Sequence, residues 1–455
     1  MSRRPAQVLV VATIVLWWGI SINFLSADYS VFPDTSSYQV QLGFPVSFSG
    51  DAWRAWPTPL LFAISAEYRI QVLLQTAVYG LGWTIILWAF FLRVRFVVAV
   101  VATTFVTALA LTPLYLQWTL TILSEAIVLG FLLIGIGLAE VARRRVVVGS
   151  GTKLSTWALV GLSIAFIGMS TMSRLTLLPF LVGIGALLVV SMARARQLLA
   201  AIVLIFGIVG TSGYAFWLNE RIDEHWGVSR TATYYGYLSA RGTPLQETLA
   251  DPLHAYVTAR GPECLGSLRA SSGGVDGPDP WEFRRELNVN CPEGVAWLEA
   301  HFRSEYAAFL VGNPRYTTRL VLEYLPTSGD ATGYAQVVSV LPAPAAALFS
   351  SPNADGHEYR PIYMWMLGGI SALALGVISL IRRSGNRSGA ESGLVIIGGA
   401  LTSLLLTVVT LNSEVARITS QATALLIFGV VASFALRFGS PTGRFKQDCP
   451  QVMEE

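Results

Sequence analysis

Ten long apolar runs, nine of them without a charged residue, constrain this chain more than any other feature of its sequence. Each run is close to the roughly 20 residues that an α-helix needs to cross the hydrocarbon core of a bilayer. A helix also satisfies its own backbone polar groups, as a segment in lipid must. Charged residues make up only 13% of the chain, against about a quarter in a soluble domain. We therefore predict an all-α polytopic membrane protein of about ten transmembrane helices, at 8–27, 70–92, 96–114, 119–139, 155–172, 175–192, 198–218, 362–381, 393–411 and 418–436.

The first apolar run is expected to remain in the protein as a transmembrane helix. It follows Ser2-Arg3-Arg4, and its length of about 20 residues exceeds the apolar core of a typical signal peptide. The sequence before Asp28 contains no clear small-x-small cleavage site. We therefore expect an uncleaved first span.

Basic side chains indicate how these helices are oriented. Under the ten-helix count, the basic clusters of the short loops all fall on one face, which is cytoplasmic by the positive-inside rule. The clusters are Arg3/Arg4, Arg93/Arg95, Arg143-Arg144-Arg145 with Lys153, Arg194/Arg196, Arg382/Arg383/Arg387, and Arg437, Arg444 and Lys446 of the tail. Both termini are then cytoplasmic. Arginine greatly outnumbers lysine, which is typical of GC-rich bacterial genomes, so we expect a bacterial cytoplasmic membrane.

The predicted helices divide the chain into four parts. Residues 1–218 hold the first seven helices with an outer loop at 28–69, residues 219–361 form a large extracytoplasmic loop, residues 362–437 hold the last three helices, and residues 438–455 form a cytoplasmic tail. Cys264 and Cys291 both lie in the large loop. An oxidising compartment would let them pair, and the alternative is two free thiols. We predict the disulfide.

Several classes of chemistry lack a signature in the sequence. The four histidines, His225, His254, His301 and His357, fall in the large loop without the spacing of a metal site. No Walker-type loop, glycine-rich dinucleotide loop or Ser/His/Asp order is present. We therefore expect no nucleic-acid partner and no nucleotide-driven reaction.

Asp34 is the carboxylate that carries the main functional hypothesis. It lies a short step beyond the first predicted helix, in an outer loop that also contains Tyr38 and Arg54. Transfer of a sugar from a lipid phosphate needs a base that takes the proton of the acceptor hydroxyl, and a carboxylate beside the membrane can do this. The alternative is that Asp34 or Thr35 caps a short helix.

The reaction also needs positively charged side chains that stabilise the departing phosphate. Arg54, Arg174 and Arg417 are candidates, because guanidinium groups bind phosphate in a bidentate way. Each has a competing interpretation: Arg54 can reach lipid headgroups, Arg174 can pair with Glu125 between helices, and Arg417 can pair with Glu414. Glu125 itself either supports the first helical turn together with Ser124 or serves as a second acid in a cavity.

Taken in order, these motifs resemble the GT-C superfamily of polytopic glycosyltransferases. The matching segments are Asp34-x-x-x-Tyr38 followed by Arg54-x-x-Pro57-x-Pro59-Leu60, then Leu123-Ser124-Glu125-Ala126, then Met172-Ser173-Arg174-Leu175-Thr176 followed by Pro179, and finally Asn412-Ser413-Glu414-x-x-Arg417. The resemblance covers most of the membrane part but not the loop 219–361.

The resemblance implies an inverting transfer of a sugar from a polyprenyl-phosphate donor. The acceptor would be an extracytoplasmic glycan, glycolipid or protein, and membrane lipids would surround the site. Asp34 would act as the catalytic base, with Glu125 as a second catalytic acid. The donor and its phosphate would be bound by Tyr38, Arg54, Arg174, Glu414 and Arg417.

The chain also departs from the family pattern. Asp34 lacks a nearby second acid, so the first loop contains no Asp-x-Asp metal box, and Arg417 lacks the usual following Tyr and Pro. Dependence on a divalent metal is left open. The alternative functions are an envelope polysaccharide polymerase or ligase, which also has a large outer loop, and a membrane transporter. A transporter predicts paired broken helices, and the sequence shows no internal repeat.

Overall fold

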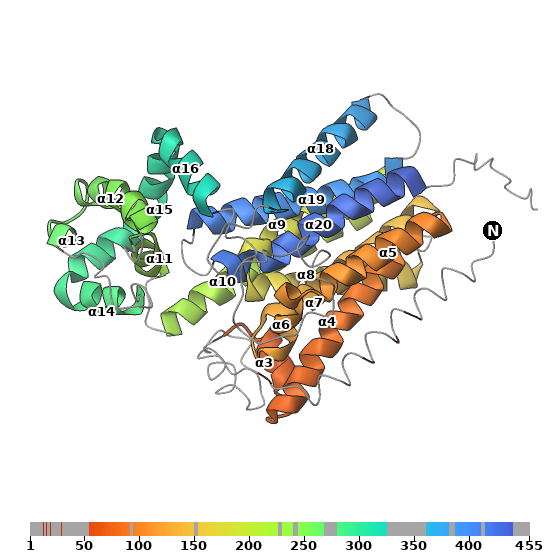
Figure 1. Ribbon diagram of the computed structural model, residues 1–455, viewed down its shortest axis with the longest axis horizontal. Helices are drawn as coiled ribbons and strands as arrows, with labels where there is room; N and C mark the ends of the chain where they lie inside the picture. Colours follow the sequence, from red (N-terminus) through yellow and green to blue (C-terminus); the bar gives the residue numbers. More distant parts are fainter. Residues whose placement is uncertain are drawn as a thin grey trace, which may run out of the picture.

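The protein folds into a bundle of membrane-length helices that carries a smaller helical subdomain at one end (Figure 1). The computed structural model describes residues 54–91, 94–149, 153–225, 230–239, 244–267, 280–324, 361–381, 387–410 and 415–439, and singly Ala12, Val15, Gly19 and Tyr29. In these residues every regular element is a helix. Seven of the helices in the described ranges are long and apolar enough to cross a membrane, so the protein is an all-α polytopic membrane protein.

The bundle is built from eleven α-helices and one short 3₁₀ helix in the described part of the chain. They are α3 Pro57–Phe62, α4 Tyr68–Phe91, α5 Phe96–Ala110, α6 Pro113–Leu120, α7 Glu125–Val147, α8 Leu154–Ser173, η1 Leu175–Leu177, α9 Leu178–Arg194, α10 Leu198–His225, α18 Pro361–Ile381, α19 Arg387–Thr410 and α20 Val415–Gly439. The candidate spans lie at Tyr68–Phe91, Glu125–Val147, Leu154–Ser173, Leu175–Arg194, Leu198–Ile222, Glu391–Val409 and Thr419–Arg437. Two further apolar stretches, Phe96–Ala110 and Met364–Gly376, are shorter. Of the first predicted span, 8–27, only three single residues are described.

The end of the third predicted span and the start of the fourth differ between the sequence prediction and the structure. Instead of reaching 114, α5 ends at Ala110, because Thr112 precedes a proline and adopts an extended conformation. The separate helix α6 follows, and α7 begins at Glu125 instead of 119. Because α7 continues to Val147, the basic cluster at 143–145 belongs to its last turns rather than to a loop.

Two central helices, α4 and α7, run parallel and approach each other closely. A Cβ atom on Gly130 of α7 would lie 2.7 Å from the Val78 carbonyl oxygen of α4. Further along, a Cβ on Gly137 would lie 2.7 Å from Ile85. Small residues at such a contact let two backbones pack tightly within a membrane. The parallel direction agrees with the predicted alternation, in which these helices are two spans apart.

Helix α8 runs antiparallel to α7, and α19 runs antiparallel to α9. On α8, Ser163 Oγ donates to Gly135 O at 2.8 Å and Ser170 Oγ donates to Val128 O at 2.9 Å. The Arg194–Glu391 ion pair joins the end of α9 to the start of α19. We call the two ends of the bundle the Glu125 end and the Arg143 end. The last turns of α7, α9 and α20 bring basic residues to the Arg143 end, namely Arg143, Arg144, Arg145, Arg194 and Arg437.

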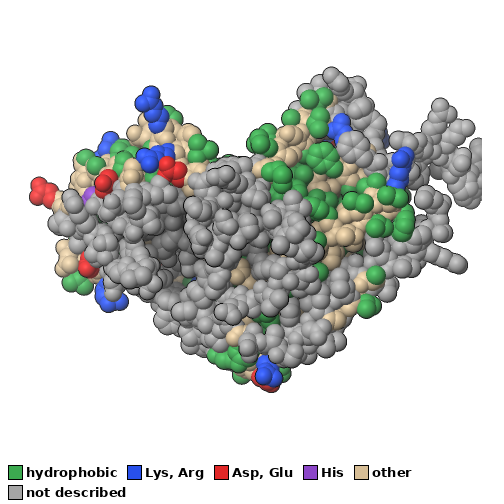
Figure 2. All heavy atoms as spheres, viewed as in Figure 1, with side chains coloured by type: hydrophobic (Ala, Val, Ile, Leu, Met, Phe, Trp, Pro, Cys, Tyr) green, Lys and Arg blue, Asp and Glu red, His purple; other side chains and the backbone are tan. Residues whose placement is uncertain are grey.

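The subdomain extends from the Glu125 end and has its own apolar core. Its helices are α11 Arg230–Leu238, α12 Pro244–Thr258, α13 Cys264–Ser267, α14 Pro280–Asn290, α15 Pro292–Gly312 and α16 Pro314–Tyr324. Tyr235, Leu298 and Phe302 are among the residues buried in that core. Figure 2 shows charged side chains of both signs over this part, whereas apolar side chains dominate the flank of the bundle along α18.

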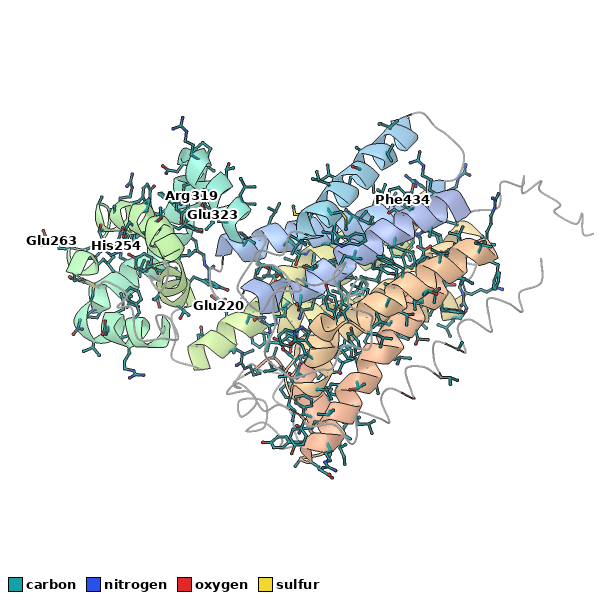
Figure 3. All side chains as sticks on the ribbon, in the orientation of Figure 1. Glu220, His254, Glu263, Arg319, Glu323 and Phe434 are labelled. Atoms are coloured by element: carbon teal, nitrogen blue, oxygen red, sulfur yellow. A yellow bond between two sulfur atoms is a disulfide. The ribbon has the colours of Figure 1, made fainter. Side chains whose placement is uncertain are left out.

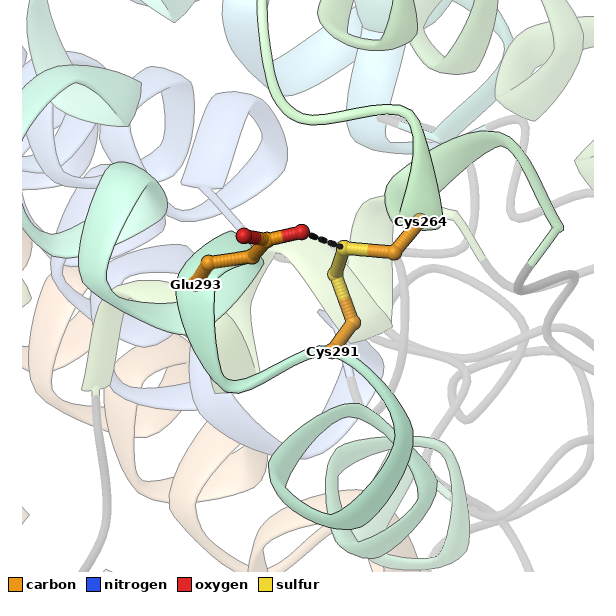
Figure 4. The surroundings of a disulfide bond; sticks show 3 residues. All are labelled: Cys264, Cys291 and Glu293. Carbon is orange, nitrogen blue, oxygen red and sulfur yellow. Dashed lines mark hydrogen bonds between the residues drawn. A yellow bond between two sulfur atoms is a disulfide. The ribbon is translucent and has the colours of Figure 1, made fainter.

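A disulfide joins Cys264 at the start of α13 to Cys291 just before α15, with 5.5 Å between the two Cα atoms. The predicted disulfide is therefore confirmed. Figure 4 shows that Glu293 lies beside it, with Oε1 3.4 Å from Cys264 Sγ. A disulfide sulfur has no proton to donate, so we regard this approach as a contact only.

Candidate functional site

A buried ion pair between Glu125 and Arg174 marks the candidate site. Arg174 Nη2 donates to Glu125 Oε1 at 2.5 Å, and the two side chains are 16% and 1% exposed, respectively. Glu125 is the first residue of α7, while Arg174 occupies the extended link between α8 and η1. The pairing that sequence analysis offered as one interpretation of Arg174 is thus present.

The buried location explains why each of these two charged side chains has a partner of opposite sign. A lone charge buried in a membrane protein carries a large desolvation penalty, which a close partner of opposite sign offsets. The backbone N–H groups at the start of α7 also favour a negative side chain at Glu125. Ser124, at the N-cap position, makes no side-chain capping hydrogen bond. The capping role predicted for Ser124 is therefore absent, and Glu125 supports its helix through the dipole.

Two amide side chains, the buried Gln75 and the partly buried Asn219, position the backbones that carry this pair. On α4, Gln75 Nε2 donates to Thr119 O at 2.6 Å and to Thr121 O at 3.0 Å, which fixes the loop before Glu125. On α10, Asn219 Nδ2 donates to Met172 O at 2.9 Å, which fixes the end of α8 before Arg174. Sequence analysis missed both residues, although a glutamine inside an apolar run was a visible signal.

Arg54 belongs to a segment that packs against the same place. Its neighbours Ala55 and Trp56 share an apolar cluster with Met172 and Leu175, the residues that flank the Ser173–Arg174 link. The structure therefore brings the segment of one predicted phosphate-binding arginine next to another. Residues from α10 complete the cluster: Ala215, Leu218, Ile222 and Tyr214.

Arg174 keeps one donor that its carboxylate partner does not use. Its Nε atom is buried and has no acceptor among the residues that the structure describes. Buried donors in proteins are almost always hydrogen-bonded, so an exception calls for an explanation such as a ligand. An anion with several acceptor oxygens would suit a guanidinium at this position.

The remaining predicted site residues cannot be placed. Asp34, Tyr38 and Glu414 lie outside the described residues, and Arg417 falls in α20 with a side chain that is not described. Their roles stay predictions. Within the described ranges, no group of three or more His, Cys, Asp or Glu side chains could hold a metal ion.

A second charged cluster lies inside the Arg143 end. Glu140 accepts from Arg143 Nε at 2.8 Å and from Arg144 Nε at 2.5 Å, and Ser392 of α19 donates to the same carboxylate. Glu140 and Arg143 are each 1% exposed, and they line a small cavity with Phe90 and other apolar residues. Sequence analysis treated Arg143 as a loop residue, whereas the structure buries it in an ion pair with Glu140 on the same helix.

His254 contacts the core of the subdomain and has a structural role. His254 Nδ1 lies 2.7 Å from Tyr235 Oη, and Tyr235 is buried in the subdomain core (Figure 3).

Comparison of the chain with protein-family models, with curated proteins and with solved structures gives no match. The functional argument therefore depends on the residues themselves.

Proposed function

We propose that this protein is an integral membrane glycosyltransferase that moves a sugar from a polyprenyl-phosphate donor to an extracytoplasmic glycan, glycolipid or protein. The supporting observation is the buried Glu125–Arg174 pair, beside the segment of Arg54, at the end of the bundle opposite the basic helix ends. Sequence motifs far apart in the chain predict that these three residues belong to one site. Their convergence is what a shared site requires.

The chemistry of the proposed step needs one base and one cluster of positive charge. Asp34 takes the proton of the acceptor hydroxyl as its oxygen bonds to the anomeric carbon of the sugar. The bond between that carbon and the donor phosphate breaks, and the phosphate leaves with the electron pair. Arg54, Arg174 and Arg417 stabilise the negative charge on it. Attack opposite the leaving phosphate inverts the anomeric centre.

Glu125 holds Arg174 in place in this proposal. With a side chain 1% exposed and a 2.5 Å contact to Arg174, it is placed to orient the guanidinium. Its predicted role as a second catalytic acid remains untested. Tyr38 and Glu414 would complete the donor site from the outer loop and from the turn before α20.

The proposed orientation puts the site on the extracytoplasmic side of a bacterial cytoplasmic membrane. Arginines gather at the Arg143 end, as expected of a cytoplasmic face. The disulfide between Cys264 and Cys291 lies beyond the opposite end, and disulfides persist in oxidising compartments. In the full topology the predicted spans at 8–27, 96–114 and 362–381 bring the total to ten, and the loop 219–361 shapes the acceptor side.

The second candidate function is an envelope polysaccharide polymerase or ligase. The disulfide-closed helical subdomain favours it, because enzymes of that class place functional residues in one large outer loop. His254 is a less suitable functional residue there, since it is hydrogen-bonded to the buried Tyr235. In this alternative the carboxylate of Asp34 has no catalytic task.

Substitution of Asp34 separates the two candidates. Membranes that contain the full-length protein would receive polyprenyl-phosphate-linked sugars, and release of the free polyprenyl phosphate would be measured. We expect Asp34→Asn to lose about 10²–10⁴-fold in rate, the typical contribution of a general base. The matched control is Asp51→Asn in the same outer loop, which should retain activity. Near-normal turnover of a well-expressed Asp34→Asn protein would remove the catalytic assignment and favour the polymerase or ligase.

A further inference from the structure

Helix α16 joins the subdomain to the bundle and has two different faces. One face packs against the bundle core through the buried Leu320 and the partly buried Tyr316 and Val321. Contacts with α19 place the helix beside a membrane span. In Figure 1, α16 lies next to the end of α19 and runs across the direction of the bundle rather than along it. Such an orientation is that of a helix in the plane of a membrane surface.

The other face of this region carries apolar side chains that the protein does not cover. Leu322 on α16 is 54% exposed, and Val311 at the end of α15 is 84% exposed. Near the same end of α19, Leu405 and Leu406 are 42% and 43% exposed. These two leucines belong to a candidate span, so in the membrane they face lipid. The exposed apolar surface of α16 therefore adjoins a lipid-facing surface.

Basic side chains accompany the exposed apolar ones. Arg315 and Arg319 are both exposed on α16, and Figure 3 shows Arg319 and Glu323 on this helix. Arg319 Nε contacts Glu323 Oε1 at 2.5 Å, so that pair is neutral and Arg315 supplies the net positive charge. Arginines beside apolar residues are the arrangement of an amphipathic helix whose cations reach lipid phosphates.

The corner between α15 and α16 is held firmly. Pro314 begins α16 directly after Asn313, and Thr317 Oγ1 donates back to Leu310 O at 2.8 Å. The rings of Phe309 and Tyr316 meet edge to face, with 4.7 Å between their centroids. A rigid corner fixes the depth of both Val311 and Leu322 relative to the bundle.

We propose that α16 and the α15–α16 corner form an interfacial element that rests on the outer leaflet. Val311 and Leu322 enter the boundary between headgroups and acyl chains, and Arg315 binds the phosphates of phospholipid headgroups. The element anchors the subdomain to the bilayer surface at a second place besides the spans. This role is independent of the reaction that the protein catalyses.

The test uses a fluorescent label on the full-length protein in nanodiscs of phosphatidylcholine and phosphatidylglycerol. In a Cys449→Ser background, Leu322→Cys would carry an environment-sensitive dye, while Cys264 and Cys291 remain in their disulfide. Val289→Cys is the matched control, because Val289 is 74% exposed on α14, which lies away from the bundle. Quenching would be compared between acyl-chain-brominated phosphatidylcholine and aqueous iodide.

We expect brominated lipid to quench the label at 322 strongly and iodide to quench it several-fold less than the label at 289. Equal iodide quenching at both positions, without quenching by brominated lipid, would overturn the proposal. Protection of position 322 from both quenchers would also overturn it, in favour of a protein partner. Arg315→Glu should reduce brominated-lipid quenching at 322 more in phosphatidylglycerol-containing discs than in phosphatidylcholine alone, and an equal effect would refute the headgroup contact.

Discussion

Arg174 and Glu125 are 49 residues apart in the sequence, yet their side chains form an ion pair of 2.5 Å at the Glu125 end of the bundle. The pair joins α7 to the link between α8 and η1. Removing the Glu125 carboxylate would leave the Arg174 guanidinium beside apolar helices without its ion-pair partner. The pair is therefore both a structural contact and the part of the candidate site that experiment can reach first.

Neutralising one member of this pair should be more harmful than neutralising both. Loss of one partner from a buried ion pair typically costs about 3–5 kcal/mol. We expect Glu125→Gln to lower Tm in detergent more than the double variant Glu125→Gln/Arg174→Gln does. Additive effects of the two single substitutions would show that the side chains are not coupled. Arg221→Gln is the control, because its ion pair with Glu224 is exposed and should contribute little.

Activity gives a second measure of the same residues. If Arg174 stabilises the departing phosphate, Arg174→Lys keeps a positive charge but loses the bidentate geometry. We expect kcat to fall more than KM rises, since the contact strengthens as the phosphate leaves. An unchanged kcat in a folded Arg174→Lys protein would confine Arg174 to a structural role.

The charged cluster at the Arg143 end should matter for stability rather than for transfer. Glu140→Gln removes the carboxylate that holds Arg143, Arg144 and Ser392 together. We expect a loss of about 3–5 kcal/mol, seen as a clear fall in Tm. Arg145→Gln is the control on the same helix: Arg145 donates to Ser155 in an exposed contact, and its loss should stay within about 0.5 kcal/mol.

The close approach of α4 and α7 predicts that Gly130 tolerates no side chain. A Cβ at this position would meet the Val78 carbonyl oxygen at 2.7 Å, so Gly130→Ala must push two parallel helices apart. We expect a marked loss of folded protein in thermal unfolding. Gly161→Ala on α8 serves as the control, because its Cβ would meet nothing within 4 Å. That variant should be neutral or gain up to about 1 kcal/mol from helix propensity.

The disulfide predicts a simple labelling pattern. Alkylation of non-reduced protein followed by mass mapping should modify Cys449 but neither Cys264 nor Cys291, and all three should react after denaturation and reduction. Quantitative alkylation of Cys264 and Cys291 without reduction would exclude the bond. Loss of a disulfide commonly costs about 2–5 kcal/mol in small domains, so a Cys264→Ser/Cys291→Ser variant should destabilise the subdomain.

Topology reporters test the orientation that the basic residues indicate. Fusions after Arg145 and Gly385 should report the cytoplasm, and a fusion at Gly273 should report the outside. An outside signal at Gly385 would contradict an even number of spans and cytoplasmic termini. Because each fusion probes a single point, the three results together fix whether the number of spans between the fused positions is odd or even.

Periodicity and composition were enough to predict most of the long helices. Apolar length predicted the spans that correspond to α4, α7, α8, α9, α10, α19 and α20, because a bilayer imposes its thickness directly on the sequence. The sequence predicted separate spans at 96–114 and 119–139 but not the helix α6 between them, because the stretch from 96 to 124 contains no charged residue. Only the break before Pro113 and the extended Thr121 divide it.

Pairwise contacts were harder to predict than spans. The Glu125–Arg174 contact was one of two interpretations that the sequence offered for Arg174, because each charge is conspicuous in an apolar segment. Burial of Arg143 was not foreseen, because a basic residue near a helix end normally signals a cytoplasmic loop. Its partner Glu140 is in turn held by Ser392, which is far away in the sequence and is an uncharged, common residue. The carbonyl groups held by Gln75 and Asn219 likewise carry no sequence signal, since every residue has one.

One hydrogen bond connects the subdomain to the last turn of a helix in the bundle. Tyr306 on α15 donates to Val409 O at 2.7 Å, and burial raises the pKa of Tyr306, which keeps its hydroxyl protonated. Val409 lies in the last turn of α19, where carbonyl groups have no partner inside the helix. The terminal turn of a membrane span is thus completed by a residue from outside the bundle. Fraying of that turn and undocking of the subdomain then form one cooperative event, which amide hydrogen exchange would report as a single opening free energy for both.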